Sequence, residues 1–441
     1  KNKSNFNGSF WIEDYVTNLN FPWSFTWLPN GDLLVTERLG KIKLIRNGKF
    51  INYIKNVPNV MSSSPFDGLL DIKIDPDFLN NSFIYLSYTK GTTTNRIGVV
   101  YRAKLENNSL INGKEIYNTS PPAPTGGPNI TKLQFLNDKS LVFAVGSSGQ
   151  HAYNMVQRLD GDIGKIIRIN TDGSIPEDNP IKIDKPDSKP GLWATGLRSV
   201  GGLALDDNNQ LWAVDMGPQG GDELNIIEPG GNHGFPLVSW GFDYSGRALS
   251  EKQTAIGFID PIISWSPSIS PFGLAYYNSD IFPNWKGDFF IGVLGDQTII
   301  RIKVKDKKVI QQENIIPDLN ERIRSIEVGP DGFIYASTDS SKGKIIRLRP
   351  GKPEKDQLER VSKPFPIPKD NEVSYDVIRK KKIIGSLVSK FIVEDDKIIL
   401  HSVLDIDVKV LFFPAYKFYQ ETKETWIDDN FVSIDGFTDF E

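Results

Sequence analysis

One motif returns six times along this chain, and that repetition constrains the fold more than any other feature. Each copy joins an apolar strand, a turn rich in Asn, Asp and Gly, and a second strand with period-two alternation of Val, Ile, Leu, Phe and Tyr. The copies begin at Trp23, Leu69, Ile130, Gly201, Phe272 and Ile323. Repeats of about 40 to 50 residues with four strands are typical of propeller blades. The pattern predicts an all-β fold, a six-bladed β-propeller over residues 1–350 with its blades in 10–350. A β-sandwich with long loops would not explain six copies.

The amino-acid composition of the sequence changes after Pro350. Residues 351–372 are rich in proline and charge and are expected to form a linker. Residues 373–441 read as a small antiparallel β domain, truncated or completing its sheet against something else. Hairpin turns are expected at Arg379–Lys382, Glu394–Lys397 and Asp428–Asn430. The apolar run Val410–Phe413 is expected to be a core strand.

Charge and composition exclude several classes of protein. The 441 residues contain 51 basic and 55 acidic side chains, a net charge of −4, which argues against nucleic acid as a partner. The chain has no cysteine, so disulfides, thiolate catalysis and sulfur-ligated metals are excluded. No apolar segment is long enough for a transmembrane helix. Because the sequence starts at Lys1 without Met, we expect a periplasmic or exported protein whose signal peptide has been removed.

Several motifs in the repeats carry a family resemblance. They are FPWSFTWLPNGDLLVTERLGKIKLI, GLLDIKIDPDF, GPQGGDELNIIEPGGNHGFP, SPSISPFGLAYY and RIRSIEVGPDG. Together, and in this order, they resemble the glucose/sorbosone dehydrogenase family, soluble aldose sugar dehydrogenases that use pyrroloquinoline quinone (PQQ) and calcium. The resemblance covers nearly all of residues 10–350. It implies a cofactor lying across the top of the propeller, over the central channel.

The resemblance also implies metal ligands. In the family, the calcium that ligates the quinone is held partly by main-chain carbonyls of a Gly-Pro pair, which Gly217 and Pro218 match. A second calcium in part of the family uses a Glu and an Asn-Tyr-Gly segment, which correspond here to Glu223 and to a segment with His233 in place of Tyr. Oxygen ligands of this kind suit a hard cation.

Three arginines fall on the family's cofactor-binding positions, namely Arg198, Arg322 and Arg324. PQQ carries three carboxylates, and guanidinium groups pair with carboxylates in a bidentate manner. Without the resemblance, the Arg-Ile-Arg-Ser segment would be read as an alternating strand with exposed arginines.

The sequence departs from the family where the oxidation would take place. The family's general base is a histidine, and the matching position here is Pro128, which cannot accept a proton. A Gln or Glu that touches the cofactor in the family is replaced by Phe66. His151 is the one histidine expected near the channel mouth and is a weak substitute base, since a histidine in a loop is more often a solvated surface residue.

Three hypotheses follow. The first is an active PQQ- and calcium-dependent aldose dehydrogenase that oxidises the anomeric carbon of a sugar by hydride transfer to PQQ and passes electrons to an acceptor. The alternative is a catalytically degenerate propeller that binds a sugar, a quinone or a protein. The third is a structural support for the C-terminal domain, which itself resembles a family of uncharacterised bacterial β domains. The sequence specifies no oligomeric state.

Overall fold

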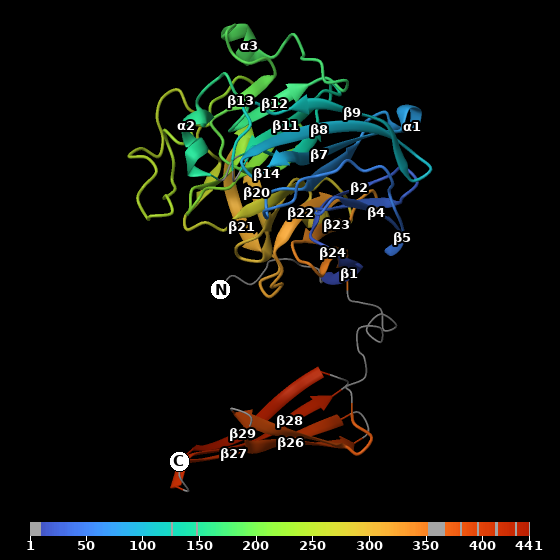
Figure 1. The fold of residues 1–441 in the computed structure, drawn as a ribbon, viewed down its shortest axis with the longest axis vertical. Helices are drawn as coiled ribbons and strands as arrows, with labels where there is room; N and C mark the ends of the chain where they lie inside the picture. Colours follow the sequence, from blue (N-terminus) through green and yellow to red (C-terminus); the bar gives the residue numbers. More distant parts are fainter. Residues whose placement is uncertain are drawn as a thin grey trace. The chain divides into compact units, whose positions relative to one another are not determined.

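The computed structural model describes residues 10–124, 127–146, 149–351, 367–379, 382–394, 397–410, 413–427 and 430–440 (Figure 1). The chain divides into two compact units, Lys1–Gly351 and Lys352–Glu441. Most of the predicted linker, residues 352–366, lies outside the described residues.

The described residues of the first unit form six four-stranded antiparallel sheets. The first sheet holds β2 (Pro22–Trp27), β3 (Leu33–Glu37), β4 (Lys41–Arg46) and β5 (Lys49–Tyr53), and the second holds β6 (Leu69–Ile74), β7 (Phe83–Thr92), β8 (Asn95–Glu106) and β9 (Ser109–Asn118). The third holds β10 (Asn129–Phe135), β11 (Leu141–Gly146), β12 (Lys165–Ile169) and β13 (Leu192–Thr195). The fourth holds β14 (Val200–Leu205), β15 (Leu211–Asp215), β16 (Asp222–Ile227) and β17 (Ile263–Trp265). The fifth holds β18 (Pro271–Tyr276), β19 (Phe289–Val293), β20 (Thr298–Lys305) and β21 (Lys308–Asn314).

The sixth sheet joins the two ends of the unit. It contains β22 (Ile323–Val328), β23 (Ile334–Thr338), β24 (Gly343–Pro350) and, on its outside, β1 (Phe10–Leu19). β1 runs antiparallel to β24, from Phe10 opposite Pro350 to Leu19 opposite Gly343. The first strands of successive sheets contact one another in turn, and β22 returns to contact β2. The ring is therefore closed, and the predicted six-bladed propeller is confirmed.

Apolar side chains fill the space between neighbouring blades. Leu34 and Ile42 of the first blade, for example, pack with Leu69, Ile72 and Ile84 of the second, and all are fully buried. Successive side chains of a strand point to opposite faces of the sheet, and both faces of a blade pack against neighbouring blades. The inner strands are therefore nearly continuous apolar runs. Burial of each such side chain contributes about 1.5–3 kcal/mol.

Charged side chains cross the centre of the ring. Lys132 Nζ on β10 lies 2.6 Å from Glu327 Oε1 on β22 and 3.7 Å from Asp71 Oδ1 on β6. Lys73 Nζ, also on β6, lies 3.0 Å from the same oxygen of Glu327. Asp71 also accepts a hydrogen bond from the main-chain N–H of Leu133 at 2.6 Å. This network ties together the inner strands of the second, third and sixth blades.

Helices are few and short. The described residues contain α1 (Phe78–Asn81), α2 (Tyr153–Val156) and α3 (Pro180–Asp184), with single 3₁₀ turns η1 (Gln150–Ala152) and η2 (Pro283–Trp285). Among these residues, no helix is long and apolar enough to cross a membrane.

The second unit contains a five-stranded antiparallel sheet with its strands in chain order: β25 (Glu372–Arg379), β26 (Lys382–Glu394), β27 (Lys397–Val410), β28 (Phe413–Ile427) and β29 (Asn430–Phe440). The predicted antiparallel β fold is confirmed. The tips of the three predicted turns, residues 380–381, 395–396 and 428–429, lie outside the described residues. The prediction of one strand through Val410–Phe413 is wrong, because Val410 ends β27 and pairs with Phe413 at the start of β28. An apolar segment of sequence does not by itself show whether it lies within one strand or spans the end of one strand and the start of the next.

Candidate active site

A cavity of about 220 Å³ brings together residues that lie far apart in the sequence. Its lining residues are Pro65, Phe66, Arg198, Met216, Gly217, Pro218, Tyr244, Ser270, Leu294, Arg322 and Arg324. Most come just before an inner strand (β6, β14, β18 or β22) or just after the strand that follows it (β15 or β19). Since adjacent strands are antiparallel, these positions all meet at one end of the ring. The cavity therefore gathers the three predicted arginines with Gly217 and Pro218.

Arg324 is a deeply buried cation of the cavity. Its side chain is 2% exposed, and its guanidinium carbon lies 4.3 Å from the ring centre of Trp23 and 4.4 Å from that of Phe272. Nη2 donates to Asp339 Oδ2, whereas Nε and Nη1 are buried and have no hydrogen-bond partner among the described residues. Burial lowers the pKa of Arg324, but a guanidinium keeps its charge. Two buried donors are thus left for an acceptor such as a carboxylate.

Arg198 is held by oxygen atoms of the surrounding loops. Its Nη1 donates to the carbonyl of Met216 at 2.6 Å, and its Nε and Nη2 donate to the hydroxyls of Tyr153 and Tyr244, each at 3.2 Å. Its main-chain N–H donates to Asp215 Oδ2 at 2.7 Å. Burial raises the pKa of Asp215 to about 6. These three partners of the Arg198 side chain are neutral oxygen atoms that fix its orientation.

Arg322 and a fourth arginine complete a positive cluster. Arg322 is half-exposed, donates from Nη1 to the carbonyl of Leu294 at 3.0 Å, and has Nε 3.6 Å from Asp339 Oδ2. Arg38 follows β3, donates to the carbonyl of Ser64 at 2.5 Å, and is close enough for its charge to lower the pKa of Arg324. Asp339 thus neutralises part of a cluster with several positive charges. This is the charge pattern that a ligand with several carboxylates requires.

The loop with Gly217 and Pro218 is fixed from behind by Asp222. This buried carboxylate accepts hydrogen bonds from the main-chain N–H groups of Gly217 at 2.8 Å, Ile269 at 2.7 Å and Ser270 at 2.9 Å. A Cβ at Gly217 would lie 2.1 Å from the carbonyl oxygen of Gly220, so only glycine fits there. The two predicted calcium-binding positions consequently lie on a loop whose path is determined by hydrogen bonds.

The other two predicted metal residues do not line the cavity. Glu223 lies on β16 opposite Asp215, and burial together with the charge of Asp215 raises its pKa to about 8. His233 is 4% exposed, burial lowers its pKa to about 4, and neither ring nitrogen has a hydrogen-bond partner among the described residues. No group of three or more His, Asp and Glu side chains in the described part of the chain is arranged to hold a metal ion.

None of the eleven lining residues carries an imidazole or a carboxylate. Pro128 is buried immediately before β10 and does not line the cavity. The backbone of His151 lies in η1, but its side chain is outside the described part of the structure. Phe66 and Met216 occupy the cavity wall, and the volume of about 220 Å³ is below the range of about 300–1,000 Å³ typical of small-molecule sites.

Sequence reasoning missed Arg38, Tyr153 and Tyr244. Tyr153 lies in the short helix α2, and Tyr244, which is 57% exposed, lies outside the strands. Both contact Arg198 from segments that lack the repeated motif. Arg38 lies in the Thr-Glu-Arg-Leu-Gly segment of the first motif, but nothing in its spacing distinguishes it from a surface cation.

Comparison with known proteins identifies relatives of the propeller. The model of the glucose/sorbosone dehydrogenase family matches residues 19–347, and that of a domain of unknown function, DUF6134, matches residues 375–440. Aldose sugar dehydrogenase YliI of Escherichia coli (strain K12) is 33% identical over 347 residues, covering 77% of this chain and 92% of that protein. Quinoprotein glucose dehydrogenase B of Acinetobacter calcoaceticus is 26% identical, covering 74% and 84%.

Solved structures agree. The apo-form of the soluble aldose sugar dehydrogenase from Escherichia coli superimposes with a TM-score of 0.74 at 33% identity, covering 78% of this chain and all of that one. The PQQ-bound form of aldose sugar dehydrogenase from Streptomyces coelicolor superimposes with a TM-score of 0.65 at 25% identity, covering 78% and 99%. The order of the motifs, the closed six-bladed ring and these matches agree, and the chain belongs to the glucose/sorbosone dehydrogenase family.

Proposed function

We propose that this chain is a catalytically degenerate aldose sugar dehydrogenase, whose propeller binds PQQ with calcium but lacks the general base for sugar oxidation. One observation carries the proposal: the cavity keeps three arginines and the Gly217-Pro218 loop, yet none of its described lining residues can accept a proton at neutral pH.

The chemistry of the donors supports a polycarboxylate ligand. The unpartnered Nε and Nη1 of Arg324 are buried and point to different sides of the guanidinium, so separate carboxylate oxygens of a polycarboxylate would be suitable acceptors for them. Arg198 and Arg322 supply further positive charge beside it. The carbonyls of Gly217 and Pro218 are ligands of the type that calcium prefers. Bound PQQ would supply a quinone that can accept a hydride, and Phe66 and Met216 would have to shift to admit it.

The missing base accounts for the predicted lack of turnover. Removal of a hydroxyl proton by a positioned side chain contributes about 10² to 10⁴ in rate. Pro128 has no basic group, and it is buried immediately before β10. The remaining residues of the cavity bind and orient an anion without activating a sugar hydroxyl.

An active dehydrogenase is the second candidate. The 33% identity to aldose sugar dehydrogenase YliI favours it. In addition, His151 is two residues from Tyr153, whose hydroxyl accepts a hydrogen bond from Arg198. A base supplied by His151 would therefore come from the segment that already contacts the arginine cluster.

The test is calorimetric titration of PQQ into calcium-loaded protein, followed by dye reduction with a panel of aldoses. We expect binding that Arg324→Met weakens by about 10- to 100-fold, as expected for loss of charged hydrogen bonds. Arg158→Met, at an exposed arginine, is the matched control and should bind as wild type.

Wild-type protein should reduce no dye with any aldose of the panel. Absence of PQQ binding would overturn the proposal. Dye reduction by the wild type that His151→Ala abolishes would instead establish the second candidate.

A further inference from the structure

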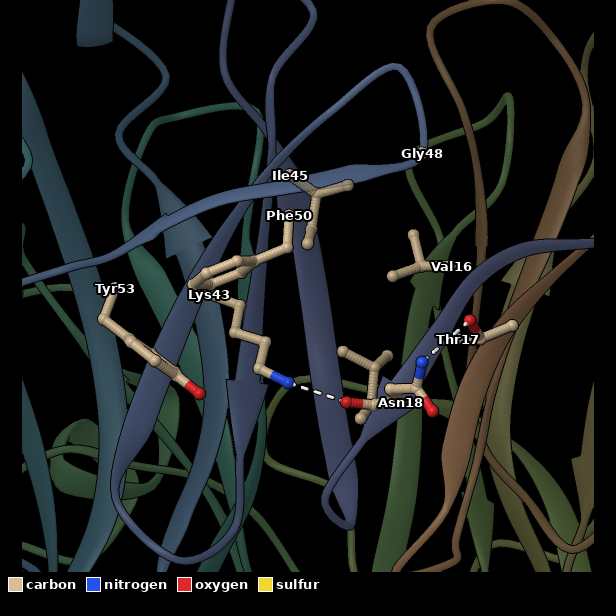
Figure 2. Close-up of a pocket in the computed structure, with 9 residues that line it drawn as sticks. Val16, Thr17, Asn18, Lys43, Ile45, Gly48, Phe50 and Tyr53 are labelled. Carbon is tan, nitrogen blue, oxygen red and sulfur yellow. Dashed lines mark hydrogen bonds between the residues drawn. The ribbon is translucent and has the colours of Figure 1, made fainter.

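A second cleft lies away from the arginine cavity, where the closing strand β1 meets the first blade (Figure 2). It has a volume of about 320 Å³, within the range of small-molecule sites. Its walls come from β1, β4 and β5, and its lining residues are Val16, Thr17, Asn18, Leu19, Lys43, Ile45, Gly48, Phe50 and Tyr53.

The local sequence explains why the cleft exists. Asn47 and Gly48 have φ values of 49° and 74°, as in the two-residue turns that favour Asn-Gly in β-hairpins. This turn joins β4 to β5 and leans on β1, because a Cβ at Gly48 would lie 2.6 Å from the carbonyl oxygen of Tyr15. The hairpin tip therefore touches β1, and the cleft remains between the two elements beneath it.

Two aromatic side chains are left open to solvent in this cleft. Phe50 is 51% exposed and Tyr53 39% exposed, and their ring centres are 5.0 Å apart at an angle of 59°. Both lie on β5, the outermost strand of its blade, whose five residues are all exposed. Paired exposed aromatic rings beside polar groups are a common sign of a ligand surface rather than of core packing.

The charge in the cleft is already balanced. Lys43 Nζ donates to the carbonyl oxygen of Asn18 at 2.8 Å and lies 3.0 Å from the buried carboxylate of Glu37 (Figure 2). Glu37 also accepts a hydrogen bond from the main-chain N–H of Asn20 at 2.7 Å. Because Glu37 neutralises Lys43, the charge of Lys43 does not favour a phosphate or a carboxylate as the ligand of this cleft.

The other polar groups that line the cleft are neutral, and Lys41 Nζ, outside this lining, lies 5.0 Å from the ring centre of Tyr53. The hydroxyl of Tyr53 has no hydrogen-bond partner among the described residues, and the exposed amide of Asn18 contacts only the Thr17 hydroxyl, at 3.5 Å. Aromatic faces that can cover the C–H face of a pyranose, surrounded by neutral hydroxyl and amide groups, suit a sugar ring. We propose that this cleft binds a neutral sugar of one or two pyranose rings.

The probe is methyl α-glucopyranoside, which has no free anomeric hydroxyl. It cannot be oxidised at the anomeric carbon, so turnover in the arginine cavity cannot interfere with the measurement, and the aromatic substitutions below assign any binding to this cleft. Saturation-transfer NMR on the full chain should show contact with the sugar, with a dissociation constant measured by titration. Phe50→Ala combined with Tyr53→Ala should weaken binding at least about fivefold.

Two controls make the result specific. Tyr375→Ala removes a tyrosine that is 60% exposed in the other unit and should leave binding unchanged. Tyr53→Phe removes only the hydroxyl and keeps the aromatic ring. The variant should therefore fold as wild type and retain most of the binding. Binding that survives the double substitution would overturn the proposal, as would no binding in the wild type. Stronger binding of methyl glucuronide than of methyl glucoside would also overturn it, since the ligand would then be an anion.

Discussion

Glu327 is the residue on which the central ion network depends. It accepts from Lys132 at 2.6 Å and from Lys73 at 3.0 Å, so one carboxylate serves two ammonium groups from neighbouring blades. Burial alone would raise the pKa of Glu327, but the charges of Lys132 and Lys73 outweigh burial and lower the pKa to about 2. Removing one partner of a buried ion pair costs far more than the pair itself contributes, because the remaining charge is left unpaired.

Glu327→Gln should therefore destabilise the propeller by about 3–5 kcal/mol at pH 7, as measured by urea unfolding. Asp280→Asn is the matched control. It breaks an exposed pair with Lys286, 2.7 Å long, and should cost less than about 1 kcal/mol. Equal effects of the two substitutions would show that the central network is solvated and weak.

The loss of unfolding free energy caused by Glu327→Gln should depend on pH. The pKa of Glu327 is lower in the folded protein, about 2, than its ordinary value of 4.5. Its contribution to stability is thus fully present above pH 4.5 and is lost as the pH falls towards 2, since the unfolded chain binds the proton first. The difference in unfolding free energy between wild type and Glu327→Gln should shrink over that interval. A difference that stays constant would contradict the pKa assignment.

At the scale of elements, the closing strand β1 decides whether the ring is complete. Leu19 at its end is 1% exposed and packs in a cluster with Phe25 and Val35 of the first blade and Ile345 of the sixth. Leu19→Ala should cost about 2–5 kcal/mol through lost burial and the cavity left behind. Leu79→Ala removes a leucine that is 83% exposed and should change the unfolding free energy by less than about 0.5 kcal/mol. Unfolding in urea measures both.

The positions of the inner strands could be predicted from the sequence, whereas the pairing of β1 with β24 that closes the ring could not. The predicted copies at Trp23, Leu69 and Ile130 begin within or at the starts of β2, β6 and β10, because period-two alternation and turn residues are local signals. The pairing of β1 with β24 joins residues such as Glu13 and Arg347, which are 334 positions apart, and no local pattern specifies such a partner.

At the scale of the whole chain, the two units have separate interiors. The buried clusters of the first unit contain no residue beyond Leu348, and Ile399 is the one apolar residue described as buried in the second. A chain ending at Gly351 should consequently melt at the same temperature as the propeller transition of the full chain, within about 2 °C. Calorimetry checks this, and a drop of several degrees would show that the second unit supports the first.

The site could be predicted only as far as the resemblance extended. Arg198, Arg322 and Arg324 were assigned by matching positions, and the fold brings them to one cavity from two blades, the fourth and the sixth. Tyr244 could not be assigned in this way, because its contact with Arg198 depends on the path of a long loop. The roles of these residues, and of Glu223 and His233, remain predictions.

The closing strand has a consequence for synthesis of the protein on the ribosome. Glu13 emerges early, yet its partner Arg347 is added 334 residues later. At about 5–20 residues per second, β1 waits roughly 17 to 70 seconds before β24 exists to receive it. During that time five blades can assemble while an edge strand with Val16 and Leu19 is left without its permanent neighbour. Nascent chains of this protein should therefore depend on chaperones until the final blade is translated.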